Sequence, residues 1–291
     1  MSILFDTDHL YILTASCQSR MGTTARVSTF LAERRMYITE MHQFDDTLSQ
    51  RFFLRATFCG VHGEQLDVEK LRAAFVEVAG IEQMEWAIYD TAEKPRVLIM
   101  VSGFDHCLED LLYRHRIGEL PMEITAVVSN HETLRPIVEA RGLRFHHLPV
   151  TAPTKPAQEQ KLRELLRQTS TELVVLARYM QILSDTLCRD LRGRAINIHH
   201  SFLPGFKGAK PYHQAYERGV KVIGATAHFV TADLDEGPII EQVVEPVDHT
   251  FTPDMLTAAG RDSERRALST AVRRYIERRV FLNGSRTVVF K

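Results

Sequence analysis

The sequence has no long hydrophobic run, no excess of charge of either sign and no signal-like N-terminus. None of its apolar stretches reaches membrane-spanning length, and no basic region followed by an apolar core opens the 291 residues. Lysine and arginine total 36 against 37 aspartates and glutamates, so no strong field attracts nucleic acid or an anionic membrane surface. We expect one or two domains and a small-molecule partner, with neither nucleic acid nor membrane bound.

Close cysteine pairs and recognisable metal-ligand spacings are also missing. The four cysteines are scattered along the chain at Cys17, Cys59, Cys107 and Cys188. Such scattering favours reduced thiols in a cytoplasmic protein. Thirteen histidines are present, but the pairs at 146–147 and 199–200 lack a third ligand at a recognisable spacing. The sequence therefore predicts a cytoplasmic protein without a catalytic metal.

The first ninety residues alternate strand-like and helix-like patterns. Strand patterns cover 9–16, 37–44, 51–59 and 84–89, and helical apolar spacing covers 22–33 and 66–79. The order βαββαβ is the ferredoxin-like arrangement, in which two helices cover one face of an antiparallel sheet. We predict a first domain over residues 1–90 and a linker over 91–95, where a polar stretch reaches a proline.

This first domain resembles an ACT domain, a small regulatory module often found ahead of metabolic enzymes. The resemblance rests on Tyr11–Cys17, on Gly22 opening the first helix and on Phe44-Asp45-Asp46 ending the second strand. The turn Ser19–Gly22 and the loop Arg34–Tyr37 depart from the family pattern where an amino-acid effector would contact backbone. Two roles stay open, a dimerisation module and an effector sensor, and the resemblance implies a homodimer or homotetramer.

The rest of the chain has the pattern of an α/β domain. Residues 96–177 alternate short β-branched runs with helical segments, which predicts a Rossmann-like, mostly parallel sheet in a second domain over 96–291. The first strand-to-helix turn has one glycine where a dinucleotide site needs three, and Asp105 in it is expected to cap the helix. A solvated or subunit-facing helix is predicted over 255–280, with Glu264 among the acids that offset part of its positive charge, and a last strand over 286–290.

Asn197, His199 and Asp235 have side chains suited to acyl chemistry. Side chains alternate along a strand, so Asn197 and His199 project to the same side of the strand predicted from residue 195. An amide can donate to the oxyanion of a tetrahedral intermediate, while an imidazole and a carboxylate can carry protons or orient each other. The three acids in the turn 232–238 repel one another, which predicts a raised carboxyl pKa there. Which of His199 and Asp235 handles each proton stays open.

Three longer segments resemble the folate-dependent formyltransferase superfamily. They are Ile196–His199 with Ser201–Pro204, then Gly224–Val230, then Leu234–Ile240. Because an ACT-like domain precedes them, the chain resembles the formyltetrahydrofolate deformylases in particular, and the likeness extends to 177–183 and 208–219. The resemblance implies hydrolysis of 10-formyltetrahydrofolate to tetrahydrofolate and formate, with folate as the substrate and no cofactor. It also implies catalytic roles for Asn197, His199 and Asp235.

The same resemblance implies how the folate is held. Two segments would form the walls around the pterin. The residues of the first are Arg178, Tyr179, Met180, Gln181, Ile182 and Leu183, and those of the second are Val230, Thr231, Ala232 and Asp233. His200 and His228 are expected beside the catalytic side chains, and two roles stay open for His228, namely contact with His199 or packing in the sheet. Two other functions stay open, namely folate-dependent formyl transfer to an amine, as in the glycinamide ribonucleotide transformylases, and folate binding by a non-catalytic regulator.

Overall fold

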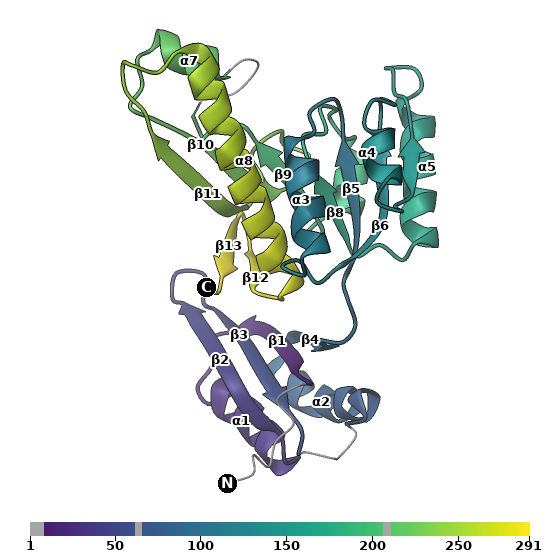
Figure 1. Cartoon of the computed structure of the whole chain (residues 1–291). Helices are drawn as coiled ribbons and strands as arrows, with labels where there is room; N and C mark the ends of the chain where they lie inside the picture. Colours follow the sequence, from purple (N-terminus) through teal and green to yellow (C-terminus); the bar gives the residue numbers. More distant parts are fainter. Residues whose placement is uncertain (1–8, 62–65, 206–210) are drawn as a thin grey trace. The chain divides into compact units, whose positions relative to one another are not determined.

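The computed structural model describes residues 9–61, 66–205 and 211–291, and the chain divides into two compact units (Figure 1). The first unit holds the residues up to 94 together with 278–283 and 288–291, and the second holds 95–277 and 284–287. The sequence-based division placed all of 96–291 in one domain, so the observed units differ from it at the C-terminus. None of the described helices is both long and apolar enough to cross a membrane.

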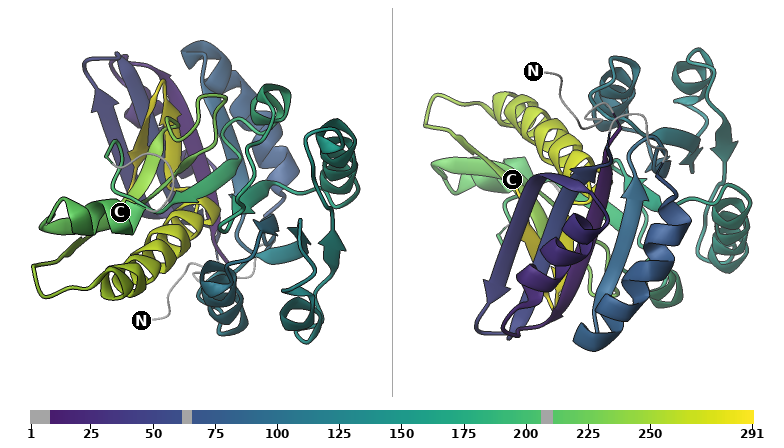
Figure 2. Two further views of the ribbon diagram at one scale, coloured as in Figure 1. Left: turned by 90° about the horizontal axis from the view of Figure 1, so that it is seen from above. Right: turned by 90° about the horizontal axis from the view of Figure 1, so that it is seen from below.

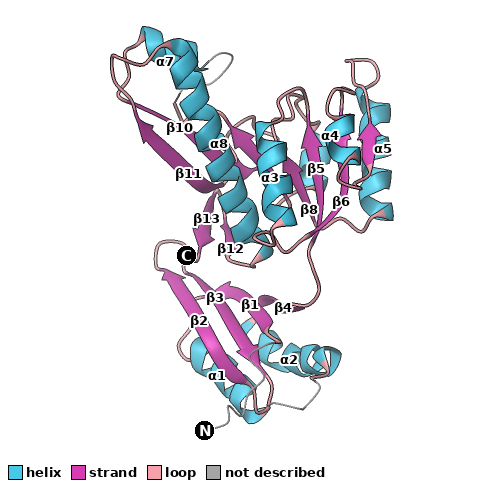
Figure 3. Cartoon of the chain, in the orientation of Figure 1, coloured by secondary structure: helices cyan, strands magenta, loops and turns pink. Residues whose placement is uncertain are grey.

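The first unit is the predicted ferredoxin-like sheet with two helices (Figure 3). Its elements are β1 (Tyr11–Gln18), α1 (Thr23–Glu33), β2 (Tyr37–Asp46), β3 (Arg51–Cys59), α2 (Val68–Glu82) and β4 (Glu85–Asp90). The strands lie in the order β2-β3-β1-β4, and the pairings of β1 with β3 and β4, and of β2 with β3, are antiparallel. Leu54 of β3 packs with Phe30 of α1 and Phe75 of α2 in one core, which confirms the βαββαβ prediction.

The opposite face of this sheet is covered by residues from the C-terminus. Side chains alternate along β3, so Phe53 and Arg55 project away from the face that carries Leu54. The ring of Phe53 is fully buried and meets the ring of Phe281, from β12 (Val280–Asn283), edge-on with centroids 5.8 Å apart. β13 (Arg286–Val289) pairs with β12, and Phe290 just after it packs edge-on against Phe281.

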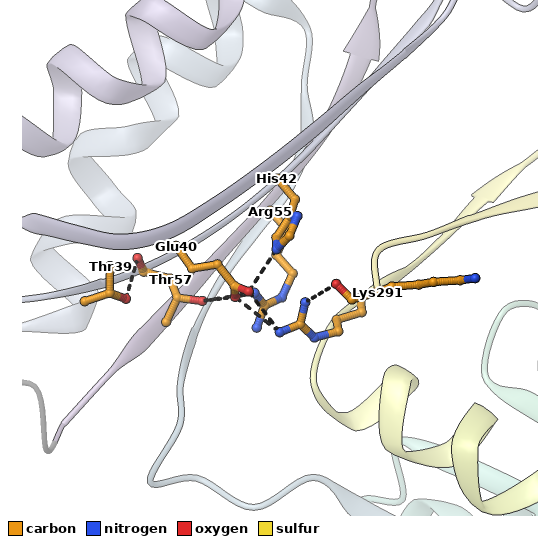
Figure 4. A network of polar contacts seen from close by, with 7 residues as sticks. Thr39, Glu40, His42, Arg55, Thr57 and Lys291 are labelled. Carbon is orange, nitrogen blue, oxygen red and sulfur yellow. Dashed lines mark hydrogen bonds and ion pairs between the residues drawn. The ribbon is translucent and has the colours of Figure 1, made fainter. Parts of the chain in front are cut away.

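Glu40 of β2 has three cationic or polar partners, and one of them, Arg279, joins this sheet to the C-terminal residues. Its carboxylate lies 2.6 Å from Nη1 of the buried Arg55, 2.8 Å from Nε2 of His42 and 3.2 Å from Nη2 of Arg279 (Figure 4). Partial burial opposes ionisation of Glu40, but the hydrogen bonds from His42, Arg55 and Arg279 outweigh it and lower its pKa from 4.5 to about 2. The charge of Glu40 therefore stabilises the first unit at neutral pH.

We expect Glu40→Gln to lower the free energy of unfolding by about 1–2 kcal/mol at neutral pH, because Arg55 then lacks its anionic partner. A lowered folded-state pKa gives stability that is present above pH 4.5 and lost as the pH falls toward 2. The difference between the two proteins should therefore shrink over that range. Urea unfolding at several pH values measures it, with the exposed Glu33→Gln as control. Equal stabilities of all three proteins at pH 7 would contradict the role given to Glu40.

The second unit is built on a sheet of seven strands. Its elements are β5 (Arg96–Val101), α3 (His106–Arg116), β6 (Glu123–Ser129), α4 (Arg135–Glu139), β7 (Phe145–His147), α5 (Lys155–Gln168), β8 (Leu173–Leu176), α6 (Asp185–Asp190), β9 (Ala195–His199), α7 (Pro211–Glu217), β10 (Val222–Phe229), β11 (Ile239–Pro246) and α8 (Pro253–Ile276). The strand order is β11-β10-β9-β8-β5-β6-β7. The five strands from β9 to β7 are parallel, whereas β10 is antiparallel to both of its neighbours, β9 and β11. The predicted mostly parallel sheet is therefore confirmed.

The pairing of β9 with β10 and the position of α8 place several residues of the cavity described below. β10 pairs with β9 so that His228 lies opposite Asn197 and Thr226 opposite His199. The long helix α8 runs alongside β10 and β11 and also contacts α3 (Figure 2).

At the start of α3, Asp105 occupies the predicted capping position and its backbone carbonyl accepts a hydrogen bond from the backbone amide of Glu109. Its carboxylate makes no capping hydrogen bond, so the predicted side-chain cap is wrong.

Candidate active site

Asn197, His199 and Asp235 meet in a cavity of about 640 Å³ at the carboxyl end of β9. Asn197 and His199 both line this cavity, as their alternation along the strand predicts. Asp235 belongs to the turn after β10 and places its Oδ2 atom 3.2 Å from Nδ1 of His199. His199 is 4% exposed, so this contact lies largely out of water. The structure thus brings together the three side chains that the sequence singled out.

The carboxyl group of Asp235 ionises more readily than an ordinary aspartate. The hydrogen bond from His199 lowers its pKa below 3.8, against a smaller opposing effect of burial. The prediction of a raised pKa in this turn is therefore wrong. The neighbouring acids Asp233 and Glu236 are exposed to solvent, which weakens their repulsion, whereas Asp235 adopts the left-handed conformation, with φ 58°, and lines the cavity beside two histidines.

His228 fixes the orientation of the Asn197 amide. Its Nδ1 atom lies 2.9 Å from the carbonyl oxygen of Phe229, which can only accept, so Nδ1 carries the proton. Burial lowers the pKa of His228 and keeps the ring neutral, so Nε2 is an acceptor. The Nδ2 atom of Asn197 lies 3.3 Å from this Nε2 and donates to it. One amide hydrogen of Asn197 is thereby engaged, and the second is left for a bound molecule.

Nε2 of His199 is a second polar atom that can contact a ligand. It is buried and lacks a hydrogen-bond partner among the described residues. A buried polar atom without a partner costs stability, which marks this nitrogen as a contact point for a ligand. The ring of His200 lies beside that of His199, with centroids 5.0 Å apart. Burial, and next the positive charge of Arg178, lower the pKa of His200 to about 4, so His200 is neutral at pH 7.

Part of the cavity wall is apolar and is formed by residues of the two segments expected to hold a pterin. Met180 and Ile182 expose 50% and 62% of their surface, which leaves their side chains free to contact a ligand. Leu183 lines the cavity but is mostly packed in the core of the unit. Every residue predicted for these walls lines the cavity except the exposed Asp233, and Leu234 beside it lines the cavity instead.

Another part of the wall is polar, and apart from Arg178 its residues were missed from the sequence. Glu264 of α8 is 1% exposed, a buried position that the sequence did not indicate. Its carboxylate accepts a hydrogen bond from the hydroxyl of Tyr212 at 2.7 Å, and it lies 2.8 Å from Nε2 of His106 and 3.3 Å from Nε of Arg178. Burial opposes ionisation of Glu264, but these partners outweigh it and lower its pKa. We call Glu264, Tyr212, His106 and Arg178 the Glu264 cluster.

Comparison with known proteins shows which family the chain belongs to. Residues 95–272 match the formyl transferase family. A formyltetrahydrofolate deformylase from Corynebacterium sp. (strain P-1) is 54% identical, over 97% of this chain and 98% of its own. The crystal structure of a formyltetrahydrofolate deformylase from Burkholderia mallei aligns with a TM-score of 0.93 and 56% identity, covering 97% of this chain and 100% of that one. The chain belongs to the formyltetrahydrofolate deformylase family.

A more distant likeness is confined to part of the chain. Glycinamide ribonucleotide transformylase 1 from Symbiobacterium toebii is 32% identical, with a TM-score of 0.65, and covers 70% of this chain and 97% of its own. The deformylase family and the transformylases therefore share one fold. The names of the two families differ in what happens to the formyl group: a deformylase removes it, and a glycinamide ribonucleotide transformylase transfers it.

The Glu264 cluster of this deformylase family member depends on a glycine within α8. A Cβ atom at Gly260 would lie 2.0 Å from Cζ and 2.2 Å from the hydroxyl oxygen of Tyr212. Glycine inside a helix is unfavourable by roughly 1 kcal/mol relative to alanine, so close packing explains it here. Gly260 allows the Tyr212 ring to lie against α8 and to reach Glu264. This mid-helix glycine is the sequence signal from which a buried neighbour could have been inferred.

The donors around Glu264 suit hydrogen bonding better than a metal ion. Ligand atoms of His106, Cys107 and Glu264 lie within 4.8 Å of one another. Burial raises the pKa of the Cys107 thiol well above its usual value, which disfavours the thiolate that binds metals. The guanidinium of Arg178 already lies beside Glu264, and a metal ion there would repel it.

Proposed function

We propose that this protein hydrolyses 10-formyltetrahydrofolate to tetrahydrofolate and formate. The observation that carries the proposal is the set of three groups that face one cavity: an oriented amide of Asn197, an unpartnered Nε2 of His199 and an ionised Asp235 paired with that histidine. Together they match the needs of a formamide that water attacks, because the reaction develops an oxyanion and moves one proton. Membership of the formyltetrahydrofolate deformylase family supports the same substrate.

In the first step, water attacks the formyl carbon and the carbonyl oxygen becomes an oxyanion. The free amide hydrogen of Asn197 donates to that oxygen. The stabilised carboxylate of Asp235 is a weak base, so we assign it the role of holding His199 with its Nδ1 proton toward Oδ2. Nε2 of His199 then accepts the proton that the attacking water loses.

In the second step, the bond between the formyl carbon and N10 breaks. His199 returns its proton from Nε2 to N10, so the folate leaves as a neutral amine. The formyl carbon keeps the oxygen of water and leaves as formic acid, which ionises to formate. The overall reaction uses one water and leaves the protonation state of the site unchanged. Met180 and Ile182 are the exposed apolar side chains that contact the pterin in this proposal.

The decisive experiment is release of formate from 10-formyltetrahydrofolate by the purified protein with no amine present. Stoichiometric formate and tetrahydrofolate support hydrolysis. Turnover that requires an added amine would instead support formyl transfer. Saturable folate binding without any turnover would support a non-catalytic regulator.

We expect His228→Phe to lower kcat roughly tenfold with little change in KM, because the Asn197 amide loses the acceptor that orients it. His228→Gln keeps an acceptor oxygen and should retain activity within about threefold of the unsubstituted protein. Steady-state formate release measures both variants. Equal losses in the two would show that His228 acts through packing and not through the amide of Asn197.

A further inference from the structure

The Glu264 cluster lies next to the catalytic groups. The ring of His200 is 5.0 Å from that of His199 on one side and 6.4 Å from that of Tyr212 on the other, centroid to centroid. Tyr212 in turn donates to Glu264, which pairs with Arg178. All of these residues line the cavity that holds Asn197 and Asp235. The Glu264 cluster is therefore a polar part of the cavity wall beside the catalytic side chains, and Arg178 connects it to the segment 178–183.

The side chain of Arg178 forms part of the cavity wall beside Glu264. Arg178 is 8% exposed, and its guanidinium lies 5.3 Å from the ring centroid of Phe104 as well as beside Glu264. Its backbone has φ 64°, and its carbonyl accepts from the amide of Ser102. Stacking, ion pairing and backbone contact thus hold a long cationic side chain in the cavity wall.

Glu264 places a negative charge at a position where this type of fold commonly binds anionic ligands. In open α/β sheets, phosphates bind at the N-terminus of the helix that follows the first strand, because its amide groups and dipole favour an anion. Here that helix is α3, and its first residue, His106, contacts the Glu264 carboxylate at 2.8 Å. A second anion at this position would have to compete with the Glu264 carboxylate for His106 and Arg178.

We propose that the Arg178–Glu264 ion pair determines acceptor specificity: it fills the part of the cavity that an amine acceptor would need and leaves water to take the formyl group. This inference rests on the proposed hydrolysis of 10-formyltetrahydrofolate. It accounts for hydrolysis on a fold shared with transformylases. If the space were open, an amine nitrogen would attack the formyl carbon, lose one proton and form the new C–N bond. The bond to N10 would break, and N10 would gain a proton.

Arg178→Gly is the variant that tests the proposal. Glycine suits the left-handed backbone at this position, while Tyr212 and His106 still hold Glu264. The assay supplies 10-formyltetrahydrofolate with a large excess of glycinamide and measures formate and N-formylglycinamide by mass spectrometry. We expect formate alone from the unsubstituted protein, and a share of N-formylglycinamide raised roughly tenfold or more above background in the variant. The ratio of products does not depend on the overall rate, so a slow variant is still informative.

The control is Tyr212→Phe, which removes one hydrogen bond to Glu264 and leaves Arg178 in place. Its product ratio should match that of the unsubstituted protein. Arg178→Asn is the second test variant, because asparagine also tolerates the left-handed conformation. Saturation-transfer NMR with glycinamide provides a readout without turnover, with binding expected only after Arg178 is replaced.

The outcomes separate this proposal from the proposed function. No formate from the unsubstituted protein contradicts the hydrolysis itself. Formate as the only product of a folded Arg178 variant, with no glycinamide binding, overturns the acceptor proposal and leaves hydrolysis standing. N-formylglycinamide from the unsubstituted protein would overturn it as well, and this test needs no variant.

Discussion

Asp235→Asn is expected to lower the rate of formate release at least roughly a hundredfold. The substitution keeps the shape of the side chain but removes the charge that pairs with Nδ1 of His199 at 3.2 Å. An asparagine can present either an oxygen or an amide to that nitrogen, so the tautomer of His199 is no longer fixed. The loss should fall on kcat and not on KM, because the imidazole acts in the chemical steps.

Glu236→Gln in the same turn is the matched control, because Glu236 is exposed and does not line the cavity. It should retain activity within about threefold. The pKa of Asp235 lies below 3.8, so its carboxylate stays ionised from pH 8 down to pH 5. Titration of Asp235 should therefore produce no fall in rate over that range. Near-unchanged turnover in Asp235→Asn would remove this residue from the mechanism.

Asn197→Ala is expected to cause a loss of similar size, at least roughly a hundredfold in kcat. The amide donates to an oxygen that carries full negative charge only in the tetrahedral state, so substrate binding should change little. Asn197→Asp separates this role from simple packing. It is nearly isosteric but presents a carboxylate to the oxyanion, so it should be slower than the alanine variant.

Single-turnover assays with 10-formyltetrahydrofolate measure both variants, and folate binding by fluorescence serves as the check on the binding step. Activity of Asn197→Asp equal to that of the unsubstituted protein would contradict the oxyanion role. A rise in KM with kcat unchanged, in either variant, would place Asn197 in substrate binding instead.

Much of the fold could be predicted because the local patterns are strong. β3 was predicted with its observed bounds, Arg51–Cys59, from a largely apolar run that follows a polar turn. Asn197 and His199 could be placed on one side of β9 because alternation along a strand is a geometric rule. α6 has six residues, too few for helical periodicity to be visible, and it was not predicted.

The remaining features depend on contacts between distant residues. Glu264 is one of several charges on a long helix, and no local pattern shows that it faces Tyr212 and His106 across the cavity. The pKa of Asp235 was predicted with the wrong sign, because its acidic neighbours are visible in the sequence whereas the inward turn toward His199 is not. Such misses cluster at the site, where local charge patterns and tertiary contacts disagree.

The return of residues 278–283 and 288–291 to the first unit affects the order in which the chain can finish folding during synthesis. The sheet of the first unit is translated first, but Phe53 and Glu40 lack their partners Phe281 and Arg279 until 183 further residues, 95–277, have been made. At ~5–20 residues per second this delay lasts roughly 10–40 s on the ribosome. The unit that begins the chain is therefore the last to be completed.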